Sequence, residues 1–78
     1  MNKDLRTTDI VLTCSLLCHG HKLDRVAMSG RRGTFYITDI PDELLDKFDN
    51  QMLMVEPKAF HTHLRDLSIR LRRVEESI

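Results

Sequence analysis

Two cysteines and four histidines are the residues of this 78-residue chain with the most recognisable chemistry. They are Cys14, Cys18, His19, His21, His61 and His63. Thiolate and imidazole both suit zinc, and residues four apart share one face of a helix. The cysteines, however, do not form the usual knuckle on a turn followed by a second such pair. His61 and His63 would also point about 200° apart on a helix. We therefore expect small buried thiols, exposed imidazoles and no metal site.

A cysteine–histidine nucleophile is the second chemistry that these residues suggest. A reactive thiol needs a lowered pKa and an accessible pocket, whereas Cys14 and Cys18 lie in an apolar segment far from any helix N-terminus. Neighbours on one helical face are about 5–6 Å apart at Cβ, and a disulfide requires roughly 3.5–4.5 Å. We expect reduced thiols in a cytoplasmic protein that is not an enzyme.

The acidic residues and the glycines give no stronger sign of catalysis. Asp42, Asp46 and Asp49 lack the spacing of a calcium loop and fit the solvated face of a helix. Gly30 and Gly33 fall between two expected strands, so they do not form a phosphate-binding loop before a helix. The sequence thus predicts no catalytic residue, no cofactor and no small-molecule substrate.

Arginines give more support to a nucleic-acid-binding surface. The candidates are Arg31 and Arg32 at a hairpin tip and Arg65, Arg70, Arg72 and Arg73 on one helix. Together they could contact phosphates on both sides of a backbone. Aromatic residues make up only 5% of the chain, and Tyr36 is the one ring expected to be exposed for stacking. Nucleic-acid binding is therefore the alternative function.

An apolar seam in the last third of the chain favours protein association instead. Its members, at steps of four and three, are Phe60, Leu64, Leu67, Leu71, Val74 and Ile78. This is the spacing of one helical face and of a coiled-coil seam. The expected contact set is Leu71, Val74, Arg70, Arg72 and Arg73. An acidic partner surface would suit it, including the Asp42, Asp46 and Asp49 stripe of a second copy in a homodimer.

The length and the charge of the chain limit which folds and partners are possible. The chain is predicted to be one small α+β domain over residues 1–78, with 1–6 and 75–78 loose. Its net charge is zero, with an acidic block at 39–56 between two basic ones, which argues against purely electrostatic nucleic-acid binding. The apolar run Ile10–Cys18 is too short to span a membrane and is preceded by aspartates, so no membrane partner is expected.

The first half of the chain predicts a helix and a β-hairpin. The helix is expected to run from an N-cap at Thr7 or Thr8 to about His19 and to end at Gly20. An irregular strand at 21–28 follows, with a bulge near Asp24–Arg25. A turn at 29–33 then leads to a strand at 34–38, with Phe35 and Ile37 on one face and Tyr36 on the other.

The second half predicts two helices separated by a short strand. Asp39 is the expected N-cap of the first helix, with Pro41 in its first turn. Its buried face contains Ile40, Leu44, Leu45, Phe48 and Met52. Residues 52–55 could add a third strand to the hairpin, and Pro57 begins the last helix. A small antiparallel-type sheet covered by helices is an α+β fold.

Several short motifs together resemble a known family. They are Thr8-Asp9, Gly20-His21-Lys22-Leu23, the aromatic strand, Asp39-Ile40-Pro41-Asp42-Glu43-Leu44 and Val55-Glu56-Pro57-Lys58-Ala59-Phe60 before a Leu/Arg-rich helix. The chain resembles, over about residues 7–73, a domain of unknown function from bacteriophages, prophages and other bacterial mobile elements. The resemblance implies a compact intracellular accessory protein, and we expect its partner to be a host or phage protein. It implies no catalytic or binding residues.

Overall fold

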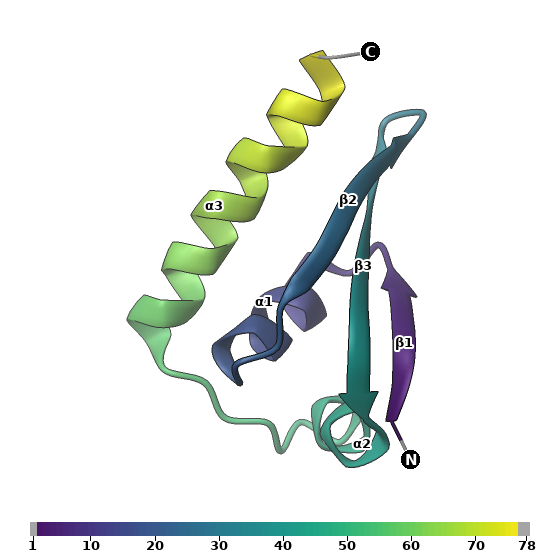
Figure 1. Ribbon diagram of the computed structural model, residues 1–78. Coiled ribbons are helices and arrows are strands. Elements are labelled where there is room, and N and C mark those ends of the chain that lie inside the picture. The colour runs from purple at the N-terminus through teal and green to yellow at the C-terminus, as the bar shows by residue number, and fades with distance from the viewer. Residues whose placement is uncertain (1, 77–78) are drawn as a thin grey trace.

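The computed structural model describes residues 2–76, except for the side chain of Ser29. The elements are β1 (Asn2–Thr7), α1 (Ile10–Cys18), β2 (Leu23–Ser29), β3 (Arg32–Pro41), α2 (Asp42–Asp49) and α3 (Pro57–Glu76). Figure 1 shows α1 and α3 on the same side of a narrow sheet, with α2 at one end of it. The predicted α+β class, with its long C-terminal helix, is confirmed. Ile78 of the seam lies outside the described residues.

The sheet has three antiparallel strands in the order β1-β3-β2. The hairpin of β2 and β3 is confirmed, and so is the irregularity in β2, where the register shifts between Leu23 and Arg25. The expectation that residues 75–78 are loose is wrong for Glu75 and Glu76, which belong to α3, while residues 1, 77 and 78 lie outside the described residues. The expectation that residues 1–6 are loose is wrong for residues 2–6, because β1 pairs with β3 along residues 2–7. That pairing joins residues more than 25 positions apart, and a polar segment with the single apolar residue Leu5 gives little local signal for it.

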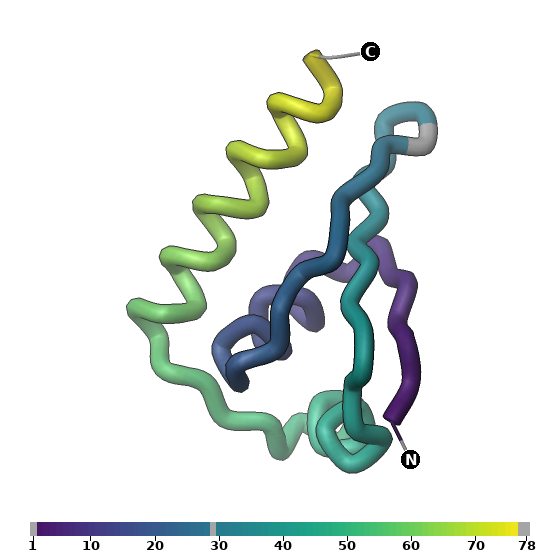
Figure 2. The backbone as a smooth tube through the Cα atoms, in the orientation of Figure 1, coloured from purple at the N-terminus to yellow at the C-terminus, as the bar shows by residue number. Residues whose placement is uncertain are grey.

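The third strand is therefore β1 and not residues 52–55. The segment between α2 and α3 contains no strand, and Figure 2 shows it as an extended connection. Met52 and Met54 are 68% and 81% exposed, while Leu53 and Val55 are half-buried. Met52 consequently does not belong to a buried face of the second helix. The ring nitrogen Nε2 of His19 lies 2.8 Å from the Met54 carbonyl oxygen, which ties this connection to the end of α1.

Two helix starts differ from the prediction by a few residues. Asp9, and neither Thr7 nor Thr8, caps α1: its Oδ1 accepts from the backbone N–H groups of Val11 and Leu12 at 3.0 and 3.1 Å. The helix ends as expected before Gly20, whose φ of 90° is the positive angle that glycine adopts readily at such an end. Asp39 is not the N-cap of α2. It lies in β3 at φ 61°, and Pro41 occupies the cap position without a side-chain hydrogen bond.

The core lies between the sheet and the helices in two adjoining clusters. One contains Cys14, Phe35 and Leu67, and the other contains Leu16, Ile37 and Ile40. Phe35 and Ile37 thus face the helices, as their spacing predicts. Leu44 and Leu45 of α2 are only half-buried against the second cluster. Among residues 2–76, no helix combines the length and apolar character that crossing a membrane requires.

The last helix begins at Pro57 as predicted, and its seam faces the core. Leu67 is buried, and the partly buried Phe60, Leu64 and Leu71 pack against the first cluster. The Glu56 side chain accepts a hydrogen bond from the Ala59 N–H at 2.6 Å and so stabilises the first turn. This packing fixes α3 across the hairpin and positions the site described next.

Candidate functional site

A cleft opens where the tip of the hairpin meets the C-terminal half of α3. A Cβ built on Gly33 would overlap the Leu71 side chain, so the absence of a side chain at Gly33 lets the helix approach the strand closely. The cleft has a volume of about 700 Å³. It is lined by Thr8, Ile10, Arg31, Arg32, Gly33, Phe35 and Leu71. We call it the hairpin–helix cleft.

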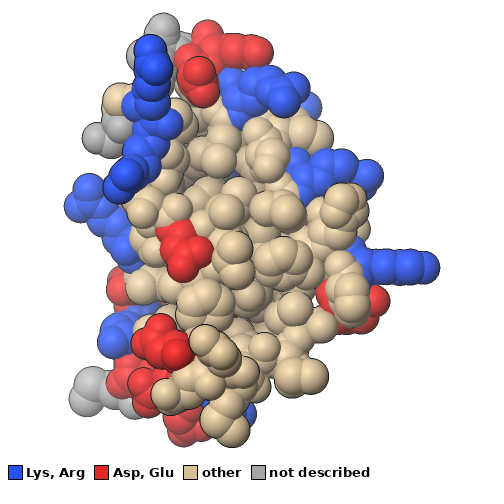
Figure 3. Space-filling view, turned by 180° about the vertical axis from the view of Figure 1, so that it is seen from behind, with Lys and Arg blue, Asp and Glu red and all other residues tan. Residues whose placement is uncertain are grey.

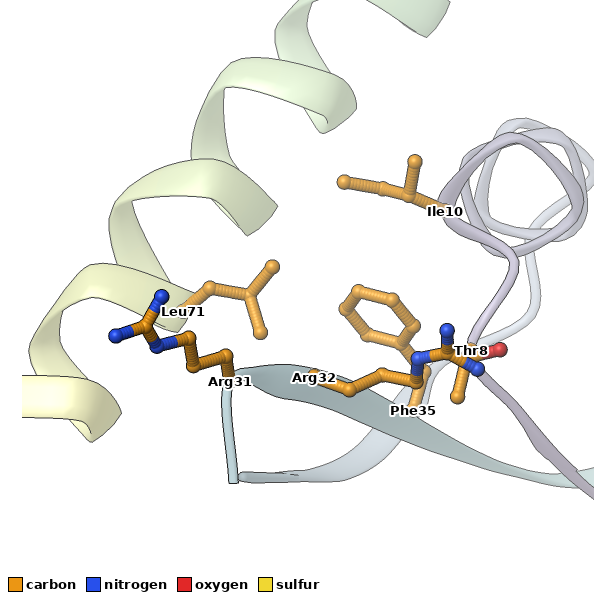
Figure 4. A pocket seen from close by; sticks show the side chains of 7 residues that line it. Thr8, Ile10, Arg31, Arg32, Phe35 and Leu71 are labelled. Carbon is orange, nitrogen blue, oxygen red and sulfur yellow. The ribbon is translucent and has the colours of Figure 1, made fainter. Parts of the chain in front are cut away.

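The hairpin–helix cleft combines an apolar floor with a basic mouth. Figure 4 shows Ile10, Phe35 and Leu71 pointing toward one another from α1, β3 and α3. Arg31 extends toward α3 and Arg32 toward Thr8, so the two guanidinium groups lie on opposite sides of the opening. Both arginines are exposed. The arrangement suits a ligand that has an apolar group with negative charge beside it.

The structure brings together only some of the predicted site residues. Arg31 and Arg32, from the hairpin tip, meet Leu71 of α3 in the cleft. Leu71 is half-buried in the core of the domain, and Val74 is half-buried one turn later. The exposed residues Arg65, Arg70, Arg72 and Arg73 do not line the cleft. Arg70 lines a smaller cavity beside β2 instead.

Sequence reasoning missed Thr8, Ile10 and Phe35 as neighbours of the two arginines. Ile10 and Phe35 read as ordinary core residues, since each fits the apolar pattern of its element. Their convergence at one opening depends on how α1 and the hairpin pack. No local pattern would have revealed it.

The opposite side of the molecule from the view of Figure 1 carries a broad surface of low charge. Figure 3 shows Lys and Arg mainly along its edges, with a few acidic groups between. Elsewhere, a second cavity of about 660 Å³ lies between α1, α2, the 50–56 connection and α3. Val11, Phe48, Leu53, Val55 and Phe60 supply most of its wall. It lacks the paired arginines of the hairpin–helix cleft.

Neither cysteine thiol has the lowered pKa that a reactive cysteine needs. Both thiols are free, Cys14 being buried and Cys18 half-buried. Burial, and next the proximity of Cys18, raises the pKa of the Cys14 thiol from 9.0 to about 11. Burial also raises the pKa of Cys18. Within residues 2–76 no three His, Cys, Asp or Glu side chains converge as a metal site would require. A thiol with a raised pKa is a poor nucleophile at neutral pH, because the thiolate is the reactive form and little of it is present.

The raised pKa of Cys14 predicts a loss of stability in alkali. The unfolded chain releases this proton near pH 9, whereas the folded chain holds it until about pH 11. The stabilisation is therefore complete below pH 9 and is lost as the pH rises toward 11. Because one pKa unit corresponds to about 1.4 kcal/mol, the loss should reach roughly 2–3 kcal/mol.

Urea unfolding at several pH values checks this prediction. The free energy of unfolding of the wild type should fall more steeply between pH 9 and about 11 than that of Cys14→Ala. The comparison cancels the groups that titrate there independently of Cys14, because both proteins share them; Cys18, which interacts with Cys14, is the exception. Parallel pH profiles would contradict the prediction.

The acidic stripe of α2 remains on the surface. Asp46 and Asp49 are exposed, while Asp42 is half-buried and forms an ion pair with Lys3 of β1, with Nζ and Oδ1 3.3 Å apart. That pair links the start of α2 to the edge strand. Because both side chains are about half exposed, the Lys3–Asp42 ion pair contributes about 1 kcal/mol or less to stability.

Comparisons with known proteins give no match to this chain among family models, curated sequences or solved structures.

Proposed function

We propose that this chain is a non-enzymatic accessory protein that acts by binding another protein through the hairpin–helix cleft. The resemblance noted in the sequence leads us to place it in the cytoplasm as a phage- or mobile-element protein, with a host or phage protein as partner. The observation that carries the proposal is the pair Arg31 and Arg32 at the mouth of a cavity whose floor is Ile10, Phe35 and Leu71.

The composition of the cleft suits a peptide segment with an apolar side chain between acidic residues. Burying one large apolar side chain in such a floor contributes about 1.5–3 kcal/mol. The guanidinium groups can then bind flanking carboxylates in bidentate geometry. A purely apolar ligand would leave both arginines unused, and a purely anionic ligand would leave the floor exposed to water. A protein segment can supply both groups at once.

Most of the α3 residues predicted as the contact set lie outside the lining of the cleft, in positions from which they can assist binding. Leu71 belongs to the floor itself, whereas Arg70, Arg72 and Arg73 surround it on the same stretch of helix. Exposed charges of this kind mainly steer an acidic partner toward its site. The partner can also be a second copy, whose α2 stripe contains Asp46 and Asp49.

Selection from a random peptide library displayed on phage tests the proposal. We expect the selected peptides to place Asp or Glu on either side of one large apolar residue. A synthetic peptide of that type should bind Arg31→Ala/Arg32→Ala about tenfold more weakly than wild type. Two lost ion pairs of up to about 1 kcal/mol each account for that factor.

Arg65→Ala/Arg72→Ala is the matched control, because it removes the same charge from α3 away from the cleft lining. It should change the affinity by less than about threefold at moderate salt. Peptides without acidic residues, or equal losses in the two double variants, would refute the assignment of the cleft. Sedimentation of the free protein over a range of concentrations reports separately on a homodimer.

A further inference from the structure

The outer face of the sheet, opposite the helices, presents a tyrosine between two arginines. Phe35 and Ile37 of β3 point into the core, so the intervening Tyr36 points outward. Figure 1 shows no helix of the described chain on that side of the sheet. Tyr36 is half-buried, and its cross-strand partners are Arg6 of β1 and Arg25 of β2.

Both arginines lie against the tyrosine ring. The guanidinium carbon of Arg25 is 4.1 Å from the ring centroid, and that of Arg6 is 5.9 Å from it. Contacts at these distances are cation–π interactions. They hold the long side chains over the ring and leave both arginines exposed. An aromatic ring with a guanidinium group directly against it is thus prearranged on an open sheet face.

Charge is distributed unevenly along this outer face. Asp39 lies toward the α2 end of β3 and its backbone N–H donates to the Asp4 carboxylate, whereas Asp24 lies in the irregularity of β2 directly before Arg25. Arg6 and Arg25 flank Tyr36 from the two neighbouring strands, so positive charge is concentrated on both sides of the ring.

From this arrangement we infer that the outer face binds single-stranded nucleic acid. An unpaired base stacks on the Arg25–Tyr36 platform, and Arg6 contacts an adjacent phosphate. Stacking on aromatic and guanidinium planes needs a base whose face is accessible, which a duplex does not offer. A short acidic peptide would pair with the arginines, but it offers no planar group that could stack on the Arg25–Tyr36 platform. The inference concerns a different face from the hairpin–helix cleft and does not depend on the proposed function.

The fluorescence of Tyr36 provides a direct test, because the chain contains one tyrosine and no tryptophan. Titration of the wild type with a short oligothymidylate at low salt should quench the tyrosine emission as the base stacks. A duplex of equal length should bind more weakly and quench little. In anisotropy measurements with a labelled oligonucleotide, Tyr36→Leu should weaken binding at least about fivefold, and Tyr36→Phe should retain the affinity.

The salt dependence of binding distinguishes contacts at the outer sheet face from nonspecific attraction by positive charge elsewhere on the protein. The slope of log affinity against log salt should become shallower by about 0.7 in Arg6→Ala, as expected for one lost phosphate contact to a single strand. Arg65→Ala removes the same charge from α3 and should leave both the quenching and the affinity nearly unchanged. Circular dichroism of each variant establishes that it is folded before it is compared.

Four outcomes would overturn the inference: no binding at low salt, binding without quenching, equal losses in Arg65→Ala and Arg6→Ala, or equal quenching by a polyglutamate peptide. The peptide-binding proposal survives each of the first three. Conversely, failure of the cleft experiment leaves the oligonucleotide result unaffected, because Tyr36 and Arg25 do not line the cleft.

Discussion

Replacing Leu67 by alanine is expected to lower the free energy of unfolding by about 2–5 kcal/mol. Leu67 is 2% exposed and is the buried residue of α3, where it meets Cys14 of α1 and Phe35 of β3. A domain of this size has a total stability of only about 4–12 kcal/mol. The substitution should therefore remove a large part of it and shift the midpoint of urea unfolding, followed by circular dichroism, to much lower urea.

Ile69→Ala is the matched control for this substitution. Ile69 lies two residues further along the same helix but is 41% exposed. Alanine has a higher helix propensity than isoleucine, so the net change should stay within about 1 kcal/mol. Equal midpoints for the two variants would show that α3 is not anchored through Leu67, and the position of the hairpin–helix cleft would then lose its basis.

Deletion of residues 2–6 is the second change with a large expected effect. It removes most of β1, and with it the pairing of Leu5 with Ile37 and of Arg6 with Tyr36. Leu5 packs against the cluster of Leu16, Ile37 and Ile40, and burial of such a side chain contributes about 1.5–3 kcal/mol. Lost ladder hydrogen bonds add about 0.5–1.5 kcal/mol each.

The shortened chain should lose at least about 3 kcal/mol of stability and show a broad unfolding transition. A two-stranded sheet is marginal on its own, and the edge of β3 would be open to pairing with other molecules, which sedimentation would detect as larger species. Lys3→Ala serves as control, since it removes only an exposed ion pair and should cost about 1 kcal/mol or less. A wild-type midpoint for the deletion variant would instead support loose residues 1–6.

The candidate sites show how far local patterns reach. Arg31 and Arg32 were predictable as a hairpin tip, because the two glycines of residues 29–33 mark a turn. The structure confirms that turn, in which Gly30 adopts φ 65°. Tyr36 was predictable as an outward ring from the two-residue period of its strand. Neither pattern says which side chains lie next to these residues. Ile10 and Leu71 reach the tip, and Arg6 reaches Tyr36, only through the packing of α1 and α3 and the pairing of β1.

By itself, the sequence determined the elements whose signals are local. The seam of α3, the glycine end of α1, the irregular β2 and the alternation in β3 each follow from residues within a few positions of one another. Tertiary structure alone decided that residues 2–7 complete the sheet, that residues 52–55 do not, and that two arginine-bearing surfaces form on different faces. The physical reason is that strand pairing and cleft formation depend on backbone hydrogen bonds and side-chain contacts between distant segments, which no short-range period encodes.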